Sequence, residues 1–283
     1  MSISVENLSY VYMQGTPFEK AALEDISLQI DDGEFVGIIG HTGSGKSTLI
    51  QHFNGLLKPT SGRVIINDID TSGKGLKELR RHVGIVFQYP EHQLFEETVY
   101  KDIAFGLRKQ NLPEEEAKEE IHRVIEAVGL STEILEKSPF ELSGGQKRRV
   151  AIAGVLAMKP SILILDEPTA GLDPRGRDEV FGFITDIHKK MGITVILVSH
   201  SMEDIAKLVN RVIVMNSGRL EMDGRIEEVF SDIERLESIG LSAPQIAYLM
   251  RSLKKLLPKI DDKAYTVAAA RDELLKHLKE RGA

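Results

Sequence analysis

Residues 35–48 read Phe-Val-Gly-Ile-Ile-Gly-His-Thr-Gly-Ser-Gly-Lys-Ser-Thr, and this stretch predicts the fold of the chain. Its first five residues form a continuous apolar run, which is typical of a strand buried on both faces of a sheet. The remainder matches the phosphate-binding pattern G-x-x-x-x-G-K-S/T, and residues 49–57 predict the amphipathic helix that follows such a loop. A glycine-rich turn with a chance lysine would need neither the strand nor the helix. We therefore expect a nucleotide site.

The residues of this loop have different expected tasks. The glycines let backbone N–H groups turn toward phosphates at the positive end of a helix. Lys46 is expected to reach the terminal phosphates, and the Ser47 hydroxyl to bind Mg²⁺. The predicted phosphate contacts are Gly40, His41, Thr42, Gly43, Ser44, Gly45, Lys46, Ser47 and Thr48.

Composition excludes several other functions. The chain has 283 residues, a formal net charge of −7 and no cysteine. An acidic balance argues against a general nucleic-acid binder, which carries a basic patch or stripe, so we expect no nucleic-acid partner. Disulfides and thiolate metal sites are excluded. The apolar runs are far shorter than the roughly 20 residues of a spanning helix, which predicts a soluble protein or one attached to a membrane through a partner.

The order of the expected elements indicates an α/β fold with two domains. Short strands begin the chain, helical spacing dominates from about 90 to 160, and strand character then returns. Strands that alternate with helices imply a mostly parallel sheet, and the segment 90–160 is expected to be a helical insertion. We place a nucleotide-binding domain at 1–230 and a C-terminal helical domain at 231–283. The C-terminal helices that we expect span Ile226–Ile239, Pro244–Leu257 and Ala264–Lys279.

Four polar side chains are expected where strands end, at the edge of the sheet at which open α/β sheets bind ligands. Asp166 follows the apolar run 162–165, and we assign it to Mg²⁺, partly through water. Glu167 can orient or deprotonate the attacking water, although both carboxylates could instead cap the next turn. His200 ends another strand and could contact the terminal phosphate. Gln88 could touch Mg²⁺ or the water.

A second glycine-rich turn, residues 142–146 (Leu-Ser-Gly-Gly-Gln), opens a predicted helix that runs to Ala157. Ser143 is a plausible N-cap, and the two glycines expose N–H groups at the positive end of the helix. One helix end per phosphate cluster is sufficient, and residues 40–48 already supply it. The turn is therefore expected to serve the phosphates bound by another chain in a head-to-tail pair. A capped helix without a ligand is the alternative.

Taken in order, these motifs resemble those of the ATP-binding cassette (ABC) family over residues 1 to about 230. The resemblance implies a P-loop NTPase cassette of α/β class, with a mostly parallel sheet, an N-terminal antiparallel β subdomain, a helical insertion and a C-terminal helical appendage. It also implies ATP and Mg²⁺ as cofactors.

The resemblance gives each motif a role. Tyr12 matches the adenine-stacking aromatic, with Tyr10 as the alternative, and residues 170–173 (Ala-Gly-Leu-Asp) match the dimer-contact loop that ends at Asp173. Gln88 matches the loop glutamine and His200 the switch histidine. The implied sets are Glu167, His200 and Gln88 for catalysis, Ser47, Gln88 and Asp166 for the metal, and Leu142, Ser143, Gly144, Gly145 and Gln146 as the signature that faces the partner's ATP.

Residues 88–95 (Gln-Tyr-Pro-Glu-His-Gln-Leu-Phe), 105–107 and 12–19 narrow the resemblance. They are similar to the ATPases of energy-coupling-factor (ECF) transporters and of related cobalt and nickel importers. This implies a translocase whose ATP hydrolysis energises uptake of vitamins or transition-metal ions. The implied partners are a second ABC ATPase (a paralogue or an identical copy), a transmembrane coupling subunit and substrate-binding membrane subunits. We expect a peripheral protein at the cytoplasmic face of the cell membrane, with the C-terminal helices helping to hold the dimer.

Two alternatives stay open at this point. Another class of ABC transporter, or a regulatory ABC ATPase without a transport role, would share the same motifs. DNA-repair cassettes carry long coiled-coil insertions or zinc-binding cysteines, and this chain has a short insertion and no cysteine. Tyr89, Pro90, Leu94 and Phe95 predict an apolar docking patch for a helix of the membrane subunit, unless they pack beneath the helical insertion.

Overall fold

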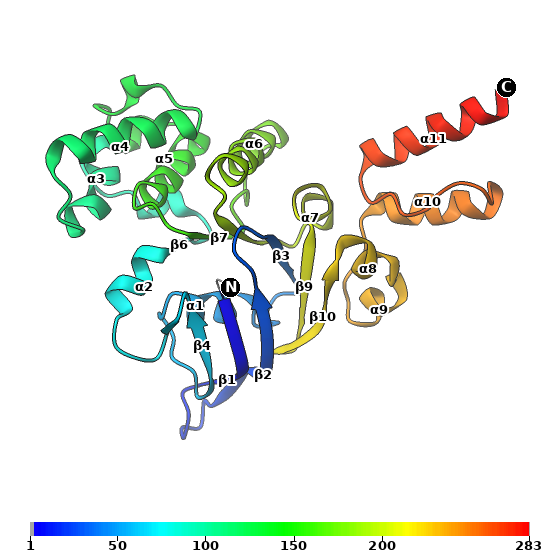
Figure 1. Cartoon of the computed structure of the whole chain (residues 1–283), viewed down its shortest axis with the longest axis horizontal. Helices are drawn as coiled ribbons and strands as arrows, with labels where there is room; N and C mark the ends of the chain where they lie inside the picture. Colours follow the sequence, from blue (N-terminus) through cyan, green and yellow to red (C-terminus); the bar gives the residue numbers. More distant parts are fainter. Residues whose placement is uncertain (1–2, 283) are drawn as a thin grey trace.

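The computed structural model describes residues 3–282, with a six-stranded sheet at its centre (Figure 1). Its strands are β3 (Phe35–Ile39), β6 (Val83–Val86), β7 (Ile162–Asp166), β8 (Thr194–Val198), β9 (Arg211–Asn216) and β10 (Arg219–Arg225). Their order is β10-β9-β3-β8-β7-β6. Only β10 pairs antiparallel, with β9 at one edge, among the described strands of this sheet. The mostly parallel sheet expected from the sequence is confirmed.

The apolar run of β3 serves two cores, one on each face of the sheet. Phe35 and Ile39 pack among the helices on one side, whereas Val36 and Ile38 pack toward a second sheet on the other. This alternation follows from the two-residue period of a strand. Both faces are covered, so every residue of β3 is buried, and the phosphate-binding loop that follows it starts from a fixed point.

The second sheet is antiparallel and lies below the first in Figure 1. It consists of β1 (Ile3–Tyr12), β2 (Lys20–Ile30), β4 (Ser61–Ile66) and β5 (Ile69–Asp70), in the order β2-β1-β4-β5. Helix α1 (Lys46–Phe53) buries Leu49 and Ile50 between the two sheets. The N-terminal antiparallel subdomain is confirmed. The sequence predicts separate short strands at Ile3–Val5 and Leu8–Tyr12, but β1 is one strand whose register shifts around Asn7, at φ 49°.

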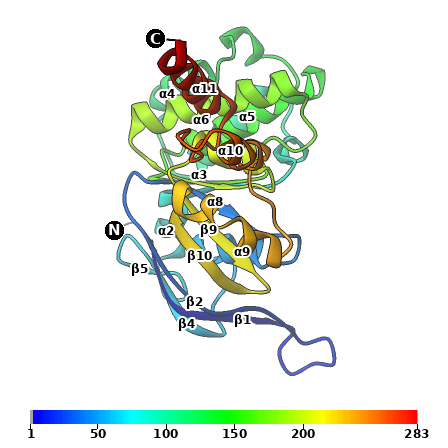
Figure 2. The ribbon, with the colours of Figure 1, turned by 90° about the vertical axis from the view of Figure 1, so that its right-hand side faces the viewer.

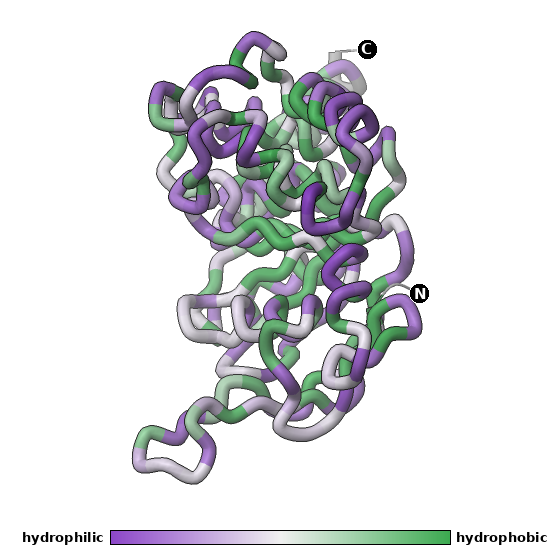
Figure 3. Tube along the Cα trace, turned by 90° about the vertical axis from the view of Figure 1, so that its left-hand side faces the viewer, coloured by the Kyte–Doolittle hydropathy of each residue, from purple (hydrophilic) through white to green (hydrophobic). Residues whose placement is uncertain are grey.

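The expected helical insertion separates β6 from β7. It contains α3 (Val99–Lys109), α4 (Glu114–Ala127) and α5 (Gly144–Leu156), with short 3₁₀ turns η1 (Pro90–Gln93), η2 (Thr132–Ile134) and η3 (Pro139–Glu141). Helices α6 (Pro174–Met191) and α7 (Met202–Leu208) cover the same face of the sheet, and α2 (Leu76–His82) packs into the lower core through Leu79. Hydrophobic residues follow the strands between these layers, whereas the outer helical turns are largely hydrophilic (Figure 3).

The C-terminal segment forms four helices to one side of the sheet (Figures 1 and 2). They are α8 (Ile226–Ser231), α9 (Ile233–Ser238), α10 (Gln245–Leu256) and α11 (Val267–Gly282). The single helix predicted over 226–239 is wrong: it breaks at Asp232, whose side chain accepts a hydrogen bond from the Arg235 N–H and caps α9. Within residues 3–282, no helix combines the length and apolar character that a membrane crossing requires.

Candidate active site

The phosphate loop, residues 40–48, connects β3 to α1 in a backbone form that requires glycine. Gly45 has φ 102° directly before the helix, and a Cβ there would lie 2.8 Å from the Ala22 carbonyl oxygen. At Gly40, φ is 153° and a Cβ would lie 2.3 Å from the Met215 carbonyl oxygen. A larger residue at either position would push the loop away from the strands that support it.

The Lys46 ammonium lies within the phosphate loop. Its Nζ donates to the carbonyl oxygens of Gly40 at 2.7 Å and His41 at 3.0 Å. Burial lowers the pKa of Lys46, while the nearby carboxylates of Glu167 and Asp166 act in the opposite direction. A cation that has lost part of its hydration gains from an anionic partner, so the loop is suited to a polyphosphate.

Ser47 and Asp166 join α1 to the end of β7. The Ser47 hydroxyl donates to Asp166 Oδ2 at 3.1 Å. Asp166 is 8% exposed, and burial raises its pKa; the Ser47 hydrogen bond opposes this rise and the charge of Glu167 adds to it. These oxygen donors fit Mg²⁺, which relieves the cost of the buried carboxylate. No group of three or more His, Cys, Asp or Glu side chains suited to a metal occurs in residues 3–282.

Glu167 and His200 meet at the same edge of the sheet. His200 Nδ1 lies 2.8 Å from Glu167 Oε2, with the Glu167 side chain 15% exposed and the His200 side chain 75% exposed. The backbone of Glu167 has φ 51°, and its N–H donates to the Val198 carbonyl oxygen at 3.0 Å. Such a conformation in a non-glycine residue is costly and persists where the surroundings hold it. The arrangement presents a carboxylate to solvent beside an imidazole and next to the phosphate loop.

A cavity of about 450 Å³ opens beside the phosphate loop, with Tyr12 in its wall. The Tyr12 hydroxyl lies 3.2 Å from Thr48 Oγ1, and the Tyr10 ring meets the Tyr12 ring edge-on at 4.8 Å. Tyr12 is the member of this pair that lines the cavity. The wall also contains Lys20, Ala21, Ala22, Ser217 and Gly218, which the sequence analysis did not identify.

The turn 142–146, here called the signature turn, caps α5 as the sequence predicts. Ser143 Oγ accepts from the Gln146 N–H at 3.3 Å, and Gln146 Oε1 accepts from the Ser143 N–H at 3.0 Å. Leu142 is buried and anchors the turn. Apart from their chain neighbours and the backbone of α5 itself, no described part of the chain lies within 4 Å of a Cβ added at Gly144 or Gly145. The helix end is thus formed and open, and it contributes no residue to the cavity beside its own phosphate loop.

Residues 23–170 match the family described as ABC transporter. The chain belongs to the ABC transporter family. It is 63% identical to the energy-coupling factor transporter ATP-binding protein EcfA2 of Acetivibrio thermocellus, over 99% of this chain and 100% of that protein. It is 62% identical to the EcfA2 protein of Clostridium tetani, over 98% of this chain and 97% of that protein. These matches place this ABC protein among the ATP-hydrolysing, ATP-binding subunits of energy-coupling factor transporters and confirm the resemblance found in the sequence.

Two solved structures support the ABC assignment. CbiO1 from Clostridium perfringens, described as part of the ABC transporter complex CbiONQ, gives a TM-score of 0.75 at 43% identity, over 88% of this chain and 98% of that one. The ATP-binding cassette MJ0796 was solved as a dimer bound to ADP and Pi in a post-hydrolysis state. It gives a TM-score of 0.70 at 30% identity, over 79% of this chain and 98% of that one. The second shows that a cassette of this fold binds nucleotide as a dimer.

Two further ABC motifs lie at the surface of this cassette. Asp173 caps α6 by accepting from the Gly176 N–H at 2.7 Å. Gln88 is exposed after β6, and within residues 3–282 it makes no hydrogen bond or ion pair with Asp166 or Ser47. The structure thus leaves the loop glutamine outside the group formed by Ser47, Asp166, Glu167 and His200.

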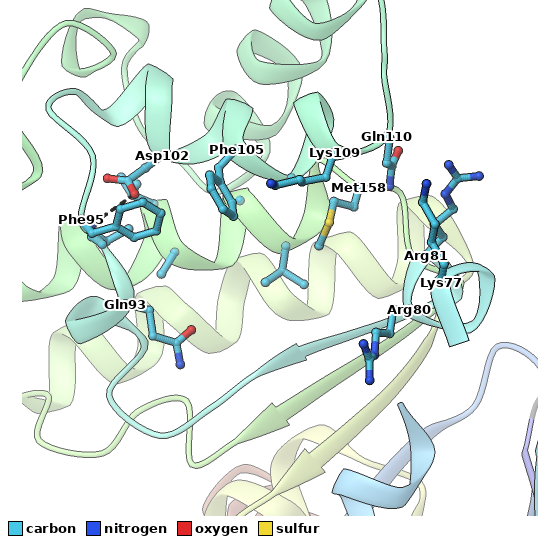
Figure 4. Close-up of a pocket in the computed structure, with 16 residues that line it drawn as sticks. Lys77, Arg80, Arg81, Gln93, Phe95, Asp102, Phe105, Lys109, Gln110 and Met158 are labelled. Carbon is cyan, nitrogen blue, oxygen red and sulfur yellow. Dashed lines mark hydrogen bonds between the residues drawn. The ribbon is translucent and has the colours of Figure 1, made fainter. Parts of the chain in front are cut away.

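A groove of about 600 Å³ runs between α2, η1, α3 and α5, and it is called here the η1 groove (Figure 4). Phe95 and Phe105 meet edge-on at 5.2 Å in its apolar wall, at 62% and 41% exposure. The rest of the wall includes Leu94, Val150, Val155 and Met158, with Lys77, Arg80, Arg81 and Lys109 around the rim. Of the residues predicted to form an apolar docking patch, Leu94 and Phe95 line this groove, whereas Pro90 is buried.

Proposed function

We propose that this chain hydrolyses ATP–Mg²⁺ within a closed pair of cassettes and so drives uptake by a membrane transporter. The observation that carries the proposal is the separation of two half-sites on one chain. The phosphate loop, Asp166, Glu167 and His200 meet at one edge of the sheet, whereas the signature turn is capped, open and absent from that site. A second cassette, either a copy or a paralogue, would supply the missing half.

The roles we propose follow the geometry. Lys46 and the N–H groups of residues 40–48 hold the phosphates, and Tyr12 stacks on adenine. Ser47 and Asp166 hold Mg²⁺, which when bound neutralises charge on the phosphate oxygens. Gln88 enters this group only when the cassettes close. Asp173 meets the partner cassette.

Glu167 acts as the general base. Its carboxylate accepts a proton from water as the water oxygen bonds to the terminal phosphorus, and the bond from that phosphorus to the bridging oxygen breaks to leave ADP. His200 orients the Glu167 carboxylate through their 2.8 Å contact. In this proposal His200 also faces the terminal phosphate. Closure completes the site, so a single cassette is expected to hydrolyse ATP slowly.

The η1 groove is the proposed docking site for a helix of a transmembrane coupling subunit. Exposed Phe95 and Phe105 offer an apolar seat, and such exposed aromatic patches mark partner sites. Through this subunit and small substrate-binding membrane proteins, the cassette would sit at the cytoplasmic face of the membrane and energise uptake of vitamins or transition-metal ions. Residues 231–283 are proposed as a dimerisation domain. A regulatory ATPase without a membrane partner would have no need for this groove.

Co-purification from detergent-solubilised membranes tests the proposal. Tagged wild-type chain should recover an integral membrane protein and hydrolyse ATP in that complex. Phe95→Asp should lose the membrane protein and retain ATP binding, whereas Leu56→Asp, at an exposed leucine outside the groove, should retain both. Recovery of no membrane protein with wild type would favour the regulatory alternative, and equal recovery with Phe95→Asp would remove the groove from the proposal.

A further inference from the structure

Arg148 is a fully buried arginine in α5, two residues after the signature turn. Its side chain is 1% exposed. Nε and Nη2 donate to the Glu91 carboxylate at 3.1 and 2.7 Å, while Nη1 donates to the carbonyl oxygens of Pro168 at 3.1 Å and Ala170 at 2.8 Å. One guanidinium therefore connects η1, which carries Glu91, with the loop between β7 and α6, which carries Pro168 and Ala170.

The loop that Arg148 holds begins at the proposed general base. The Ala170 N–H donates to the Glu167 carbonyl oxygen at 3.1 Å and closes a turn over residues 167–170. Arg148 binds the two free carbonyl groups of this turn, one of them in the residue directly after Glu167. The strained backbone of Glu167, at φ 51°, thus has a support from outside its own strand.

Arg148 and its bonds to Glu91, Pro168 and Ala170 are here called the clamp. The Glu91 end of the clamp lies beside the η1 groove. Glu91 belongs to η1, and Gln93 of the same turn lines the groove. Burial raises the pKa of Glu91, but the hydrogen bonds and charge of Arg148 outweigh it, so the pKa lies below its ordinary value and the Glu91 carboxylate is ionised near neutral pH. Tyr89, just before η1, lies next to the same loop, since a Cβ added at Gly171 would come 3.7 Å from Tyr89 Cε1.

Stability alone is a poor reason for such a buried ion pair. Desolvation of two charges costs several kcal/mol, and a well-packed apolar pair of similar volume is often as stable. The guanidinium adds what an apolar side chain cannot: fixed hydrogen bonds to two loops at once. One of them begins at Glu167, and the other, η1, starts two residues after Gln88.

We propose that Arg148 is a positioning residue, paired with Glu91, that fixes the 167–170 turn and transmits movement of η1 to it. The consequence for transport rests on the proposed function, because η1 must move when a membrane subunit occupies the groove. The clamp itself does not rest on it and can be measured in the isolated chain.

Hydrogen exchange in the isolated chain tests the clamp. Arg148→Met should speed amide exchange in the peptide covering 167–173 by about tenfold or more, while α1 keeps its wild-type rate. The control is Arg123→Met, which removes a half-exposed arginine that pairs with the buried Glu120 and touches neither loop. Unchanged exchange of 167–173 in Arg148→Met would overturn the clamp.

Steady-state hydrolysis in the assembled complex tests the positioning role. Arg148→Met should lower kcat by about tenfold or more with KM for ATP changed less than about threefold, because the phosphate loop is untouched. Arg123→Met should keep kcat within about twofold. Wild-type kcat in Arg148→Met, or an equal loss of kcat and ATP affinity that follows a lower Tm, would leave Arg148 with a structural role only.

Two further variants complete the test. Arg148→Met with Glu91→Leu removes both buried charges, so it should fold even if the single variant does not, and its kcat should stay low. Glu91→Gln keeps both carbonyl bonds of Arg148, so hydrolysis should persist while uptake per ATP falls by about threefold or more. Unchanged uptake per ATP would remove the transmission. A wild-type complex without uptake would instead count against the proposed function, and the exchange result would still stand.

Discussion

The Glu167 carboxylate lies 2.8 Å from the His200 imidazole, Oε2 to Nδ1, although the two residues follow different strands. Glu167 follows β7 and His200 follows β8, and these two strands are parallel neighbours in the sheet. Parallel pairing brings both carboxyl ends to one edge, so the fold creates the contact. The pair is the centre of the reaction that we propose.

Glu167→Gln should retain ATP binding and lose hydrolysis by a factor on the order of 10² or more, because an amide cannot accept the proton from water. Phosphate release in the assembled complex and equilibrium ATP binding measure the two effects. Glu136→Gln, at an exposed glutamate, is the matched control and should keep wild-type activity. A hydrolysis rate in Glu167→Gln that is half the wild-type rate or more would rule out Glu167 as the base.

Tyr12→Ala should weaken ATP binding by about tenfold, because loss of an aromatic platform removes a stacking energy of about 1–3 kcal/mol. Tyr12→Phe keeps the ring and loses only the contact with Thr48, so its affinity should stay close to wild type. Titration of a fluorescent ATP analogue gives both values. A larger loss in Tyr10→Ala than in Tyr12→Ala would transfer the adenine contact to Tyr10.

Asp166→Asn should stabilise the nucleotide-free chain at neutral pH while weakening its stabilisation by ATP–Mg²⁺. Burial raises the pKa of Asp166, so its stabilising contribution is full below the ordinary value of 3.8 and is lost as pH rises through the folded-state pKa. The asparagine keeps the neutral form at all pH values. Its Tm gain, on the order of a few degrees at pH 7, should disappear below about pH 4. A constant difference across pH would contradict this origin.

Leu249→Asp should weaken dimerisation through the C-terminal helices and leave ATP binding unchanged. Leu249 is 50% exposed beside a cavity of about 830 Å³ between α7, α10 and the start of α11, where Val267 is also exposed. A charge in such an apolar surface disfavours its burial against a partner. Sedimentation equilibrium at several concentrations should show a dissociation constant about tenfold or more above wild type. An unchanged constant would place the dimer contact elsewhere.

The sequence predicted the elements of the site where a local pattern specifies them. Residues 40–48 carry their own glycine requirement, and Ser143 and Gln146 cap each other within one turn. No local sequence pattern shows which other residues line the cavity beside the phosphate loop. Lys20, Ser217 and Gly218 reach it only because β2 and the β9–β10 turn pack on that loop.

Arg148 shows why a charged run can mislead. Lys147, Arg148 and Arg149 together resemble a solvated helix face, yet Arg148 is buried. Its position, four residues before Ile152 and eight before Leu156, places it on the buried stripe of α5, and that periodicity was the available signal. Its carboxylate partner, Glu91, lies far away in the chain and emerges only from the fold.

ATP-induced dimerisation of hydrolysis-deficient chains tests the shared site most directly. Sedimentation velocity with ATP–Mg²⁺ should show Glu167→Gln as a dimer with its partner cassette, whether a second copy or a co-expressed sister ATPase. A chain that carries both Glu167→Gln and Ser143→Arg should bind ATP but fail to dimerise, because the bulky side chain blocks the signature turn. The control chain, which carries Glu167→Gln and Ser131→Arg at the exposed N-cap of η2, should still dimerise. A dimer of undiminished affinity in the Ser143→Arg chain would contradict the composite site.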